Sequence, residues 1–100
     1  MHRKNIIHRD IKPQNILVMD RENLMVCIAD LGLSIKADDP RAKKEKCGTP
    51  AYVDPEVLQG SGFTLKSDIF SIGSLMFNLI TCKLIFKGNT VNEVLYRNKH

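Results

Sequence analysis

The feature that most constrains the fold is the run of residues 67–81, where apolar side chains occupy nearly every direction around a helix. Its longest apolar stretch is IFSIGSLMFNLI, at residues 69–80. A helix that is apolar on all sides must be covered on all sides. The sequence therefore predicts a central helix over residues 67–81, with other elements packed around it.

The composition is that of an ordinary globular protein. Of the 100 residues, 43% are apolar and 26% are charged, with 6 glycines and 4 prolines, which excludes disordered and fibrous classes. Residues 69–80 are too few to span a bilayer, and no apolar run follows the basic N-terminus, so we expect neither a membrane partner nor a signal peptide.

The cysteines and the charges indicate the compartment and exclude some ligands. Cys27, Cys47 and Cys82 are odd in number, far apart and without a C-x-x-C pair, which favours a reducing, cytoplasmic interior over disulfides or a zinc site. The net charge is +4, and the densest basic run is RAKKEK at residues 41–46. No aromatic residue interleaves this run, so it predicts a mobile, solvated loop rather than a nucleic-acid interface.

The pattern of short elements indicates the α+β class. Strands are predicted over residues 5–7, 16–18 and 24–29, the second covered on both faces because it is continuously apolar. The other predictions are an extended stretch at 31–35, an exposed loop at 36–47, a helical turn at 55–58 and a last helix at 91–97.

A hairpin made of the second and third strands would bring two oxygen-bearing side chains together. Asn15 comes just before the second strand and Asp30 just after the third, and a hairpin places its open ends side by side. Amide and carboxylate oxygens suit Mg²⁺, which takes its remaining ligands from water and substrate phosphates. Gly32 allows the backbone to turn directly after Asp30.

Asp10 and Lys12, shortly before Asn15, would stand at the edge of the same site. A carboxylate can orient a hydroxyl nucleophile and take its proton, and an ammonium can balance charge on a phosphoryl group. Phosphoryl transfer needs mainly positioning and charge stabilisation, so these side-chain types predict that chemistry.

These residues carry a resemblance to eukaryotic protein kinases. HRDIKPQN, at residues 8–15, resembles the catalytic loop H-R-D-x-x-x-x-N. DLG at 30–32 is similar to the D-F-G metal motif, with leucine for phenylalanine. GTPAY with DPE, ending at residue 56, resembles the end of the activation segment, with aspartate where A-P-E has alanine. SDIFSIG, from residue 67, resembles the D-x-W-S-x-G start of the central helix, with phenylalanine for tryptophan.

The resemblance implies a role for each residue of the predicted site. Asp10 would be the catalytic base and Lys12 would contact the transferred phosphate. Asn15 and Asp30 would hold magnesium, and Leu17 would form the floor of the adenine pocket. Taken alone, the same residues are also compatible with a surface ion pair, caps of the hairpin ends and ordinary core packing.

The family pattern assigns supporting roles as well. His8 would pack and hydrogen-bond structurally, and Asp68 would accept hydrogen bonds from the backbone of the catalytic loop. Glu56 would pair with an arginine further along the chain, for which residues 57–100 offer no clear candidate.

Lys12 together with Gly48-Thr49-Pro50 is typical of serine/threonine kinases, and Thr49 would lie near Asp10. The alternative for Thr49 is a turn hydroxyl that bonds its own backbone. Arg9 resembles the arginine that binds a phosphorylated residue of the activation loop in this family. Residues 35–48, however, contain no serine, threonine or tyrosine. We expect Glu45 to be its permanent negative partner; an ordinary solvated glutamate is the alternative.

Parts of the family pattern have no counterpart in these residues. No G-x-G-x-x-G and no V-A-I-K lysine precede the catalytic loop, so we expect residues 1–100 to be a partial kinase domain without its N-terminal lobe. It would comprise the mainly helical C-terminal lobe, with an activation segment over residues 30–56 and a short hairpin at the cleft. Such a chain, alone, is expected to expose a large apolar patch.

The sequence thus predicts a catalytic-core fragment of a serine/threonine protein kinase. The parent domain would transfer the γ-phosphate of ATP, with Mg²⁺, to a serine or threonine hydroxyl of a protein. Its expected partners are that protein substrate and another kinase lobe or a regulatory protein. The alternatives are a non-catalytic, pseudokinase-like binding module and an inactive truncated product.

Overall fold

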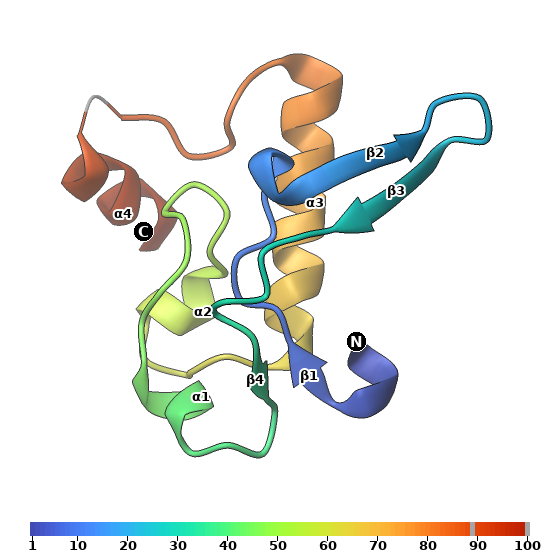
Figure 1. The fold of residues 1–100 in the computed structure, drawn as a ribbon. Helices are drawn as coiled ribbons and strands as arrows, with labels where there is room; N and C mark the ends of the chain where they lie inside the picture. The colour runs from blue at the N-terminus through green and yellow to red at the C-terminus, as the bar shows by residue number, and fades with distance from the viewer. Residues whose placement is uncertain (89, 100) are drawn as a thin grey trace.

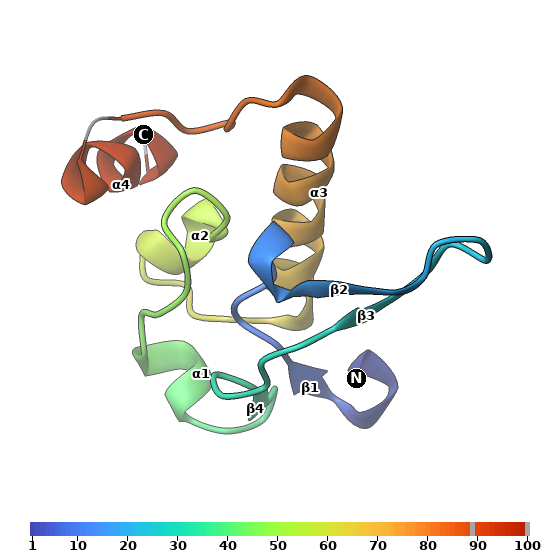
Figure 2. The same ribbon diagram turned by 45° about the horizontal axis from the view of Figure 1, so that its top comes forward.

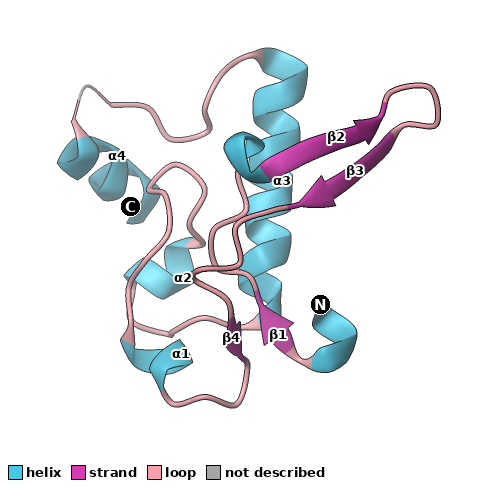
Figure 3. Cartoon of the chain, in the orientation of Figure 1, coloured by secondary structure: helices cyan, strands magenta, loops and turns pink. Residues whose placement is uncertain are grey.

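The computed structural model describes residues 1–88 and 90–99, and it confirms the α+β class. Short helices and strands pack beside one long helix, mostly on one side of it (Figures 1 and 3). In chain order the elements are η1 (His2–Lys4), β1 (Ile6–Ile7), η2 (Pro13–Asn15), β2 (Ile16–Asp20), β3 (Met25–Ile28), β4 (Ile35–Lys36), α1 (Arg41–Lys44), α2 (Pro55–Leu58), α3 (Leu65–Thr81) and α4 (Val91–Lys99).

The long helix α3 confirms the predicted central helix and begins slightly earlier, because of its N-terminal cap. The Thr64 side chain accepts from the Lys66 amide, and the Ser67 hydroxyl accepts from the Thr64 amide at 2.9 Å, a capping box. The helix ends at Cys82, whose backbone is left-handed.

The predicted hairpin is also present. β2 and β3 pair antiparallel with Ile16 opposite Ile28, and they project away from the other elements in both views (Figures 1 and 2). Asp20 shapes the turn between them by accepting from the Glu22 amide at 2.9 Å and from the Asn23 side chain at 2.6 Å. The Asn23 hydrogen bond lowers the pKa of the Asp20 carboxyl.

A small apolar core lies below the hairpin, where β1 pairs antiparallel with β4. It is formed by buried side chains from both strands, α1, the segment before α2, α2 itself and the loop before α3: Ile7, Ile35, Ala42, Val53, Val57 and Phe63. This core fixes the loop after β1 relative to the start of α3, and that loop carries the polar residues 8–15.

Two loop predictions are wrong. Residues 36–47 are not simply an exposed loop, because α1 forms within them and turns Ala42 into the core. Residues 31–35 are not extended throughout: the Ser34 amide bonds the Leu31 carbonyl in a turn, and only Ile35 and Lys36 join a strand.

The described residues do not cover α3 on all sides, in agreement with the expectation that this chain alone exposes a large apolar patch. Its buried residues are polar: Ser67, Asp68, Ser71 and Ser74. Large apolar side chains on its other faces are exposed, among them Leu79 and Ile80. The other elements pack on the serine face because their backbone carbonyls find hydrogen-bond donors there, and no described element covers the opposite face.

The strand at residues 16–18 is likewise not covered on both faces. Leu17 is 49% exposed and Val18 59% exposed. No described element packs over them. Among the described residues, no helix is both long enough and apolar enough to cross a membrane.

Candidate active site

The polar loop, residues 8–15, is fixed to α3 by one buried carboxylate. Asp68 is 1% exposed and accepts hydrogen bonds from the backbone amides of His8, at 2.8 Å, and Arg9, at 3.0 Å. His2 Nε2 lies 2.9 Å from the same carboxylate. These three contacts compensate the burial of the charge, and they set the position of the loop from the first turn of the central helix.

His8 connects the polar loop to the end of the hairpin. Its Nδ1 accepts from the Asp10 amide at 3.1 Å, so the neutral ring carries its proton on Nε2, which donates to the Ala29 carbonyl at 2.9 Å. The side chain is fully buried. Its position agrees with a structural role, as the sequence indicated.

Asp10, Lys12 and Thr49 form a hydrogen-bonded cluster. The Thr49 hydroxyl donates to Asp10 Oδ1 at 3.0 Å and accepts from Lys12 Nζ at 3.0 Å. Lys12 Nζ lies 3.6 Å from Asp10 Oδ2, and the two charged side chains are 25% and 14% exposed. The cluster therefore holds an oriented carboxylate and an ammonium beside each other, both accessible to a substrate.

Asn15 completes the polar loop at the base of the hairpin. Its Nδ2 donates to the Asp10 carbonyl at 2.7 Å and to Asp10 Oδ2 at 3.3 Å. Using the amide nitrogen in this way turns Asn15 Oδ1 away from Asp10. The Ala29 amide donates to the Asn15 carbonyl at 2.7 Å, so the two open ends of the hairpin do meet.

Asp30 follows directly, in a left-handed conformation with φ 57°, and its Oδ1 accepts from the Gly32 amide at 3.2 Å. No hydrogen bond joins its side chain to Asn15 among the described residues. The donor set nevertheless fits Mg²⁺, since both side chains offer hard oxygens. No cluster of three His, Cys, Asp or Glu side chains in residues 1–88 and 90–99 could hold a metal alone, so other ligands would have to be water and phosphate.

Arg9 joins the polar loop to the segment around α1. Its Nη1 donates to Glu45 Oε2 at 3.0 Å and its Nε to the Leu33 carbonyl at 2.6 Å, while the guanidinium lies 5.3 Å from the Phe63 ring centroid. The Arg9 side chain is 5% exposed and that of Glu45 is 45% exposed. The two residues singled out by sequence are thus in direct contact.

Cys47 lies near this ion pair without being a reactive thiol. Burial raises the pKa of the Cys47 thiol, and the positive charge of Arg9 lowers it by less. The thiol therefore stays protonated near neutral pH, which argues against a nucleophilic cysteine at the site.

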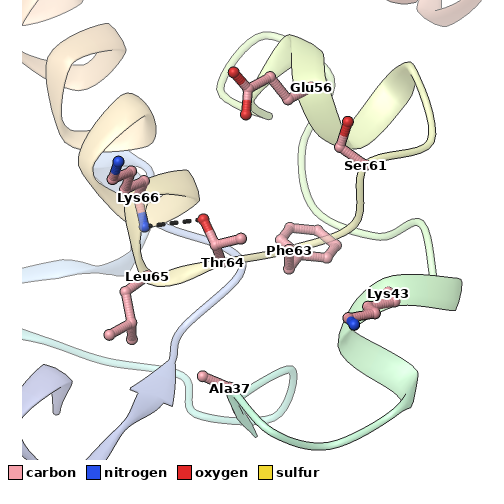
Figure 4. A pocket seen from close by; sticks show the side chains of 8 residues that line it. All are labelled: Ala37, Lys43, Glu56, Ser61, Phe63, Thr64, Leu65 and Lys66. Carbon is pink, nitrogen blue, oxygen red and sulfur yellow. Dashed lines mark hydrogen bonds between the residues drawn. The ribbon is translucent and has the colours of Figure 1, made fainter.

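Two predicted site residues stand apart from the cluster. Leu17 lies on the projecting hairpin, half exposed. Glu56 is exposed at the start of α2 and makes no ion pair with any described residue. It borders a hollow of about 580 Å³ with Phe63, Lys43 and Lys66 (Figure 4).

Some contributing residues were not found from the sequence. The contact of His2 with Asp68 had no sequence signal. Ser71 and Ser74 donate to carbonyls of residues 51 and 52, and two hydroxyls spaced along an otherwise apolar helix could have indicated a polar contact. Asn98, near the end of α4, bonds the same segment and had no sequence signal.

Comparison with known proteins agrees with this geometry. The protein kinase domain family model matches residues 1–100. Myosin light chain kinase A of Dictyostelium discoideum is 43% identical over 95 residues, which cover 94% of this chain and 32% of that protein. Serine/threonine-protein kinase nekl-2 of Caenorhabditis elegans is 35% identical, covering 97% of this chain and 27% of that protein.

CBL-interacting protein kinase 15 of Oryza sativa subsp. japonica is 40% identical, covering 99% of this chain and 23% of that protein. The chain thus spans about a third or less of the length of these relatives. The family model matches throughout, and the relatives are named as kinases. The chain therefore belongs to the eukaryotic protein kinase family.

Proposed function

We propose that the protein containing these residues is a serine/threonine kinase that transfers the γ-phosphate of MgATP to a protein hydroxyl. The cluster of Asp10, Lys12 and Thr49 is the observation that carries this proposal. It sets a carboxylate that can accept a proton beside an ammonium that can balance phosphoryl charge.

In this proposal Asp10 orients the substrate hydroxyl and receives its proton. Its carboxylate is held by Thr49 through Oδ1 and by Asn15 through Oδ2, so it is oriented before substrate arrives. Lys12 stabilises charge on the transferred group from the same side. Such preorganisation is the main contribution a protein makes to phosphoryl transfer.

Asn15 and Asp30 are the residues proposed to hold magnesium. When bound, the ion would neutralise phosphate charge. Asn15 Oδ1 is turned away from Asp10, and the Asp30 carboxylate retains Oδ2 beyond its bond to Gly32. Leu17, half exposed on β2, is proposed to contact adenine from below.

The contact between Arg9 and Glu45 supports a proposal on regulation. Arg9 is almost fully buried, and Glu45 is the one carboxylate that forms an ion pair with its guanidinium among the described residues. Residues 35–48 carry no hydroxyl that could be phosphorylated. We propose that Glu45 keeps this segment attached to the polar loop without phosphorylation.

The surroundings of the domain are also part of the proposal. The exposed apolar side chains of α3 and the hairpin would be covered by another kinase lobe or a regulatory protein. We propose a reducing, cytoplasmic location, which the odd number and wide spacing of the three cysteines support.

The test is transfer of labelled phosphate by the full-length protein to a mixture of protein substrates. We expect label from γ-labelled ATP, and none from α-labelled ATP, on phosphoserine or phosphothreonine after acid hydrolysis of the product. Transfer should require added Mg²⁺. Absence of protein labelling at any Mg²⁺ concentration would refute the proposal.

A further inference from the structure

The segment of residues 50–53, directly after Thr49, is held in an unusual way. Each of its four backbone carbonyls accepts a hydrogen bond from a buried side chain. On one side the donors come from α3: the Ser74 hydroxyl donates to Ala51 at 3.0 Å, and the Ser71 hydroxyl donates to Tyr52 at 2.7 Å.

The other two carbonyls are bonded from α4 by a single side chain. Asn98 Nδ2 donates to the Pro50 carbonyl at 2.8 Å and to the Val53 carbonyl at 2.7 Å. Asn98 is 3% exposed, although it lies near the end of a short helix whose other residues are exposed or half-buried. One amide group thus closes the segment against α3.

The amide oxygen of Asn98 indicates why an asparagine is found at this position. Asn98 Oδ1 is buried and has no hydrogen-bond partner among the described residues. Burying an acceptor without a hydrogen-bond partner costs free energy of folding. A leucine would fill a similar volume and would bury no such acceptor. We therefore attribute the role of Asn98 to its two N–H donors, which bond the carbonyls of residues 50 and 53, and not to the volume of its side chain.

The bonded segment leads directly to the reaction cluster. The Thr49 carbonyl accepts from the Tyr52 amide at 2.9 Å and from the Val53 amide at 3.2 Å, which closes a turn. The Thr49 hydroxyl then donates to Asp10. Tightening the segment from α4 thus fixes the residue that orients the Asp10 carboxylate.

The same arrangement borders an open hollow of about 270 Å³. Thr49, Pro50 and Ala51 line one wall of it, and the other wall is lined by residues before and within α4, namely Gly88, Thr90, Val91 and Val94. Asn98 holds both walls in register, because it belongs to α4 and bonds Pro50.

We propose that Asn98 is a positioning residue that sets the peptide-facing wall of residues 49–51 relative to Asp10. This inference rests on the proposed kinase function and deepens it. The Asp10 backbone is held by His8 and Asn15, and its carboxylate keeps the bond from Asn15 when the bond from Thr49 is disturbed. Loss of the Asn98 bonds is therefore expected to disturb the wall that faces the protein substrate more than the nucleotide site.

The test compares Asn98→Leu with Asn92→Leu in the full-length protein. Asn92 lies on the same helix and is exposed, so it controls for the change in polarity. Two hydrogen bonds are lost in Asn98→Leu, and we expect kcat/KM for a peptide substrate to fall about tenfold or more. The KM for MgATP and the rate of ATP hydrolysis to water should stay within about twofold of the unmodified protein.

Asn98→Gln, which retains the amide donors, should recover part of the lost peptide activity. A peptide kcat/KM for Asn98→Leu equal to that of Asn92→Leu would overturn the inference. So would a parallel loss of peptide phosphorylation and ATP hydrolysis. If no protein labelling is found in any variant, the proposed function itself has failed.

A second measurement covers the case in which Asn98→Leu does not fold. Hydrogen exchange compares the unmodified protein with Asn98→Ser, whose side chain is too short to bond both carbonyls. We expect the Tyr52 and Val53 amides to exchange at least about tenfold faster in the variant. The Ala29 amide, bonded to Asn15, should be unchanged. Equal exchange at Tyr52 and Val53 would contradict the positioning role.

Discussion

Arg9 combines burial, charge and an unfavourable backbone conformation at one position. Its φ is 72°, in the left-handed region that a non-glycine residue adopts only when other contacts compensate. Those contacts are the Asp68 carboxylate on its amide, and Leu33, Glu45 and the Phe63 ring on its side chain. Arg9 therefore links the central helix, the polar loop and the α1 segment.

Replacing Glu45 with alanine tests the partner of this arginine. The ion pair is half exposed on the Glu45 side, so we expect unfolding free energy to fall by no more than about 1 kcal/mol. Phosphorylation of a peptide should slow about threefold to tenfold, since the segment holding Thr49 loosens. Glu22→Ala, in the hairpin turn, is the matched control. Unchanged rate and unchanged stability for Glu45→Ala would refute the proposed role.

Two buried groups predict how stability changes at alkaline pH. Burial raises the pKa of the Cys47 thiol above its ordinary 9.0 and the pKa of the Tyr52 hydroxyl above its ordinary 10.0. A raised pKa favours the neutral form in the folded state. Its stabilising contribution is complete below the ordinary pKa and is lost as the pH rises towards the folded value.

Unfolding free energy, measured with urea, should thus fall progressively above about pH 9. The double variant Cys47→Ser, Tyr52→Phe should show a flatter dependence than the unmodified protein, whereas Cys82→Ser, at an exposed cysteine, should not. An identical alkaline slope for the double variant would show that these two groups do not cause the loss.

Single residues of the site were the most predictable part of the molecule. The positions of Asp10, Lys12 and Thr49 in one cluster, and of Asp68 beneath the polar loop, agree with the placements that the resemblance to protein kinases implied. The Thr49–Asp10 and Asp68–His8 contacts join residues 39 and 60 positions apart, so the family resemblance rather than local geometry predicted them. His2 and Asn98 escaped prediction because their contacts depend on where a whole helix packs.

The central helix shows what periodicity cannot reveal at the scale of an element. An all-round apolar pattern predicts burial in all directions, but α3 buries its serines and exposes much of its apolar surface. The apolar pattern predicts that the helix is packed against other elements, but it does not predict which elements or residues pack against it. The serine face was decided by the carbonyls of residues 51 and 52, which needed donors.

Ser71→Ala tests whether the serine hydroxyls of α3 stabilise its packing against residues 51 and 52. The hydroxyl is buried and donates to Tyr52, so its loss leaves a buried carbonyl without its donor. We expect unfolding free energy in the full-length protein to fall by about 1–3 kcal/mol. Ser61→Ala, at an exposed position before α3, should change it by less than about 0.5 kcal/mol. Equal effects of the two substitutions would mean that the serine face contributes nothing.

The whole molecule is unusually apolar on its surface. Large apolar side chains are exposed on β2, β3 and α3 at the following positions: Leu17, Val18, Met19, Met25, Val26, Ile28, Ile69, Met76, Phe77, Leu79 and Ile80. Soluble monomers seldom leave so many together without a partner surface. The expectation of exposed apolar surface on these residues is confirmed, whereas its consequence in solution stays a prediction.

The purified 100-residue chain should accordingly bind an apolar dye strongly and self-associate at micromolar concentration. Replacing Leu79 and Ile80 with lysine, at the most exposed end of α3, should reduce both effects. Sedimentation and dye fluorescence measure them. A monomer that melts cooperatively and binds little dye would contradict the prediction.

The central claim is that the Asp10 cluster is a phosphoryl-transfer centre. The most direct test is the turnover of the full-length protein with Asp10→Asn, measured against Asp38→Asn, an exposed aspartate outside the site. We predict a loss of about 10²–10⁴-fold in kcat for Asp10→Asn, with an unchanged melting temperature, and no loss for Asp38→Asn. Equal kcat values for the two variants would contradict the claim.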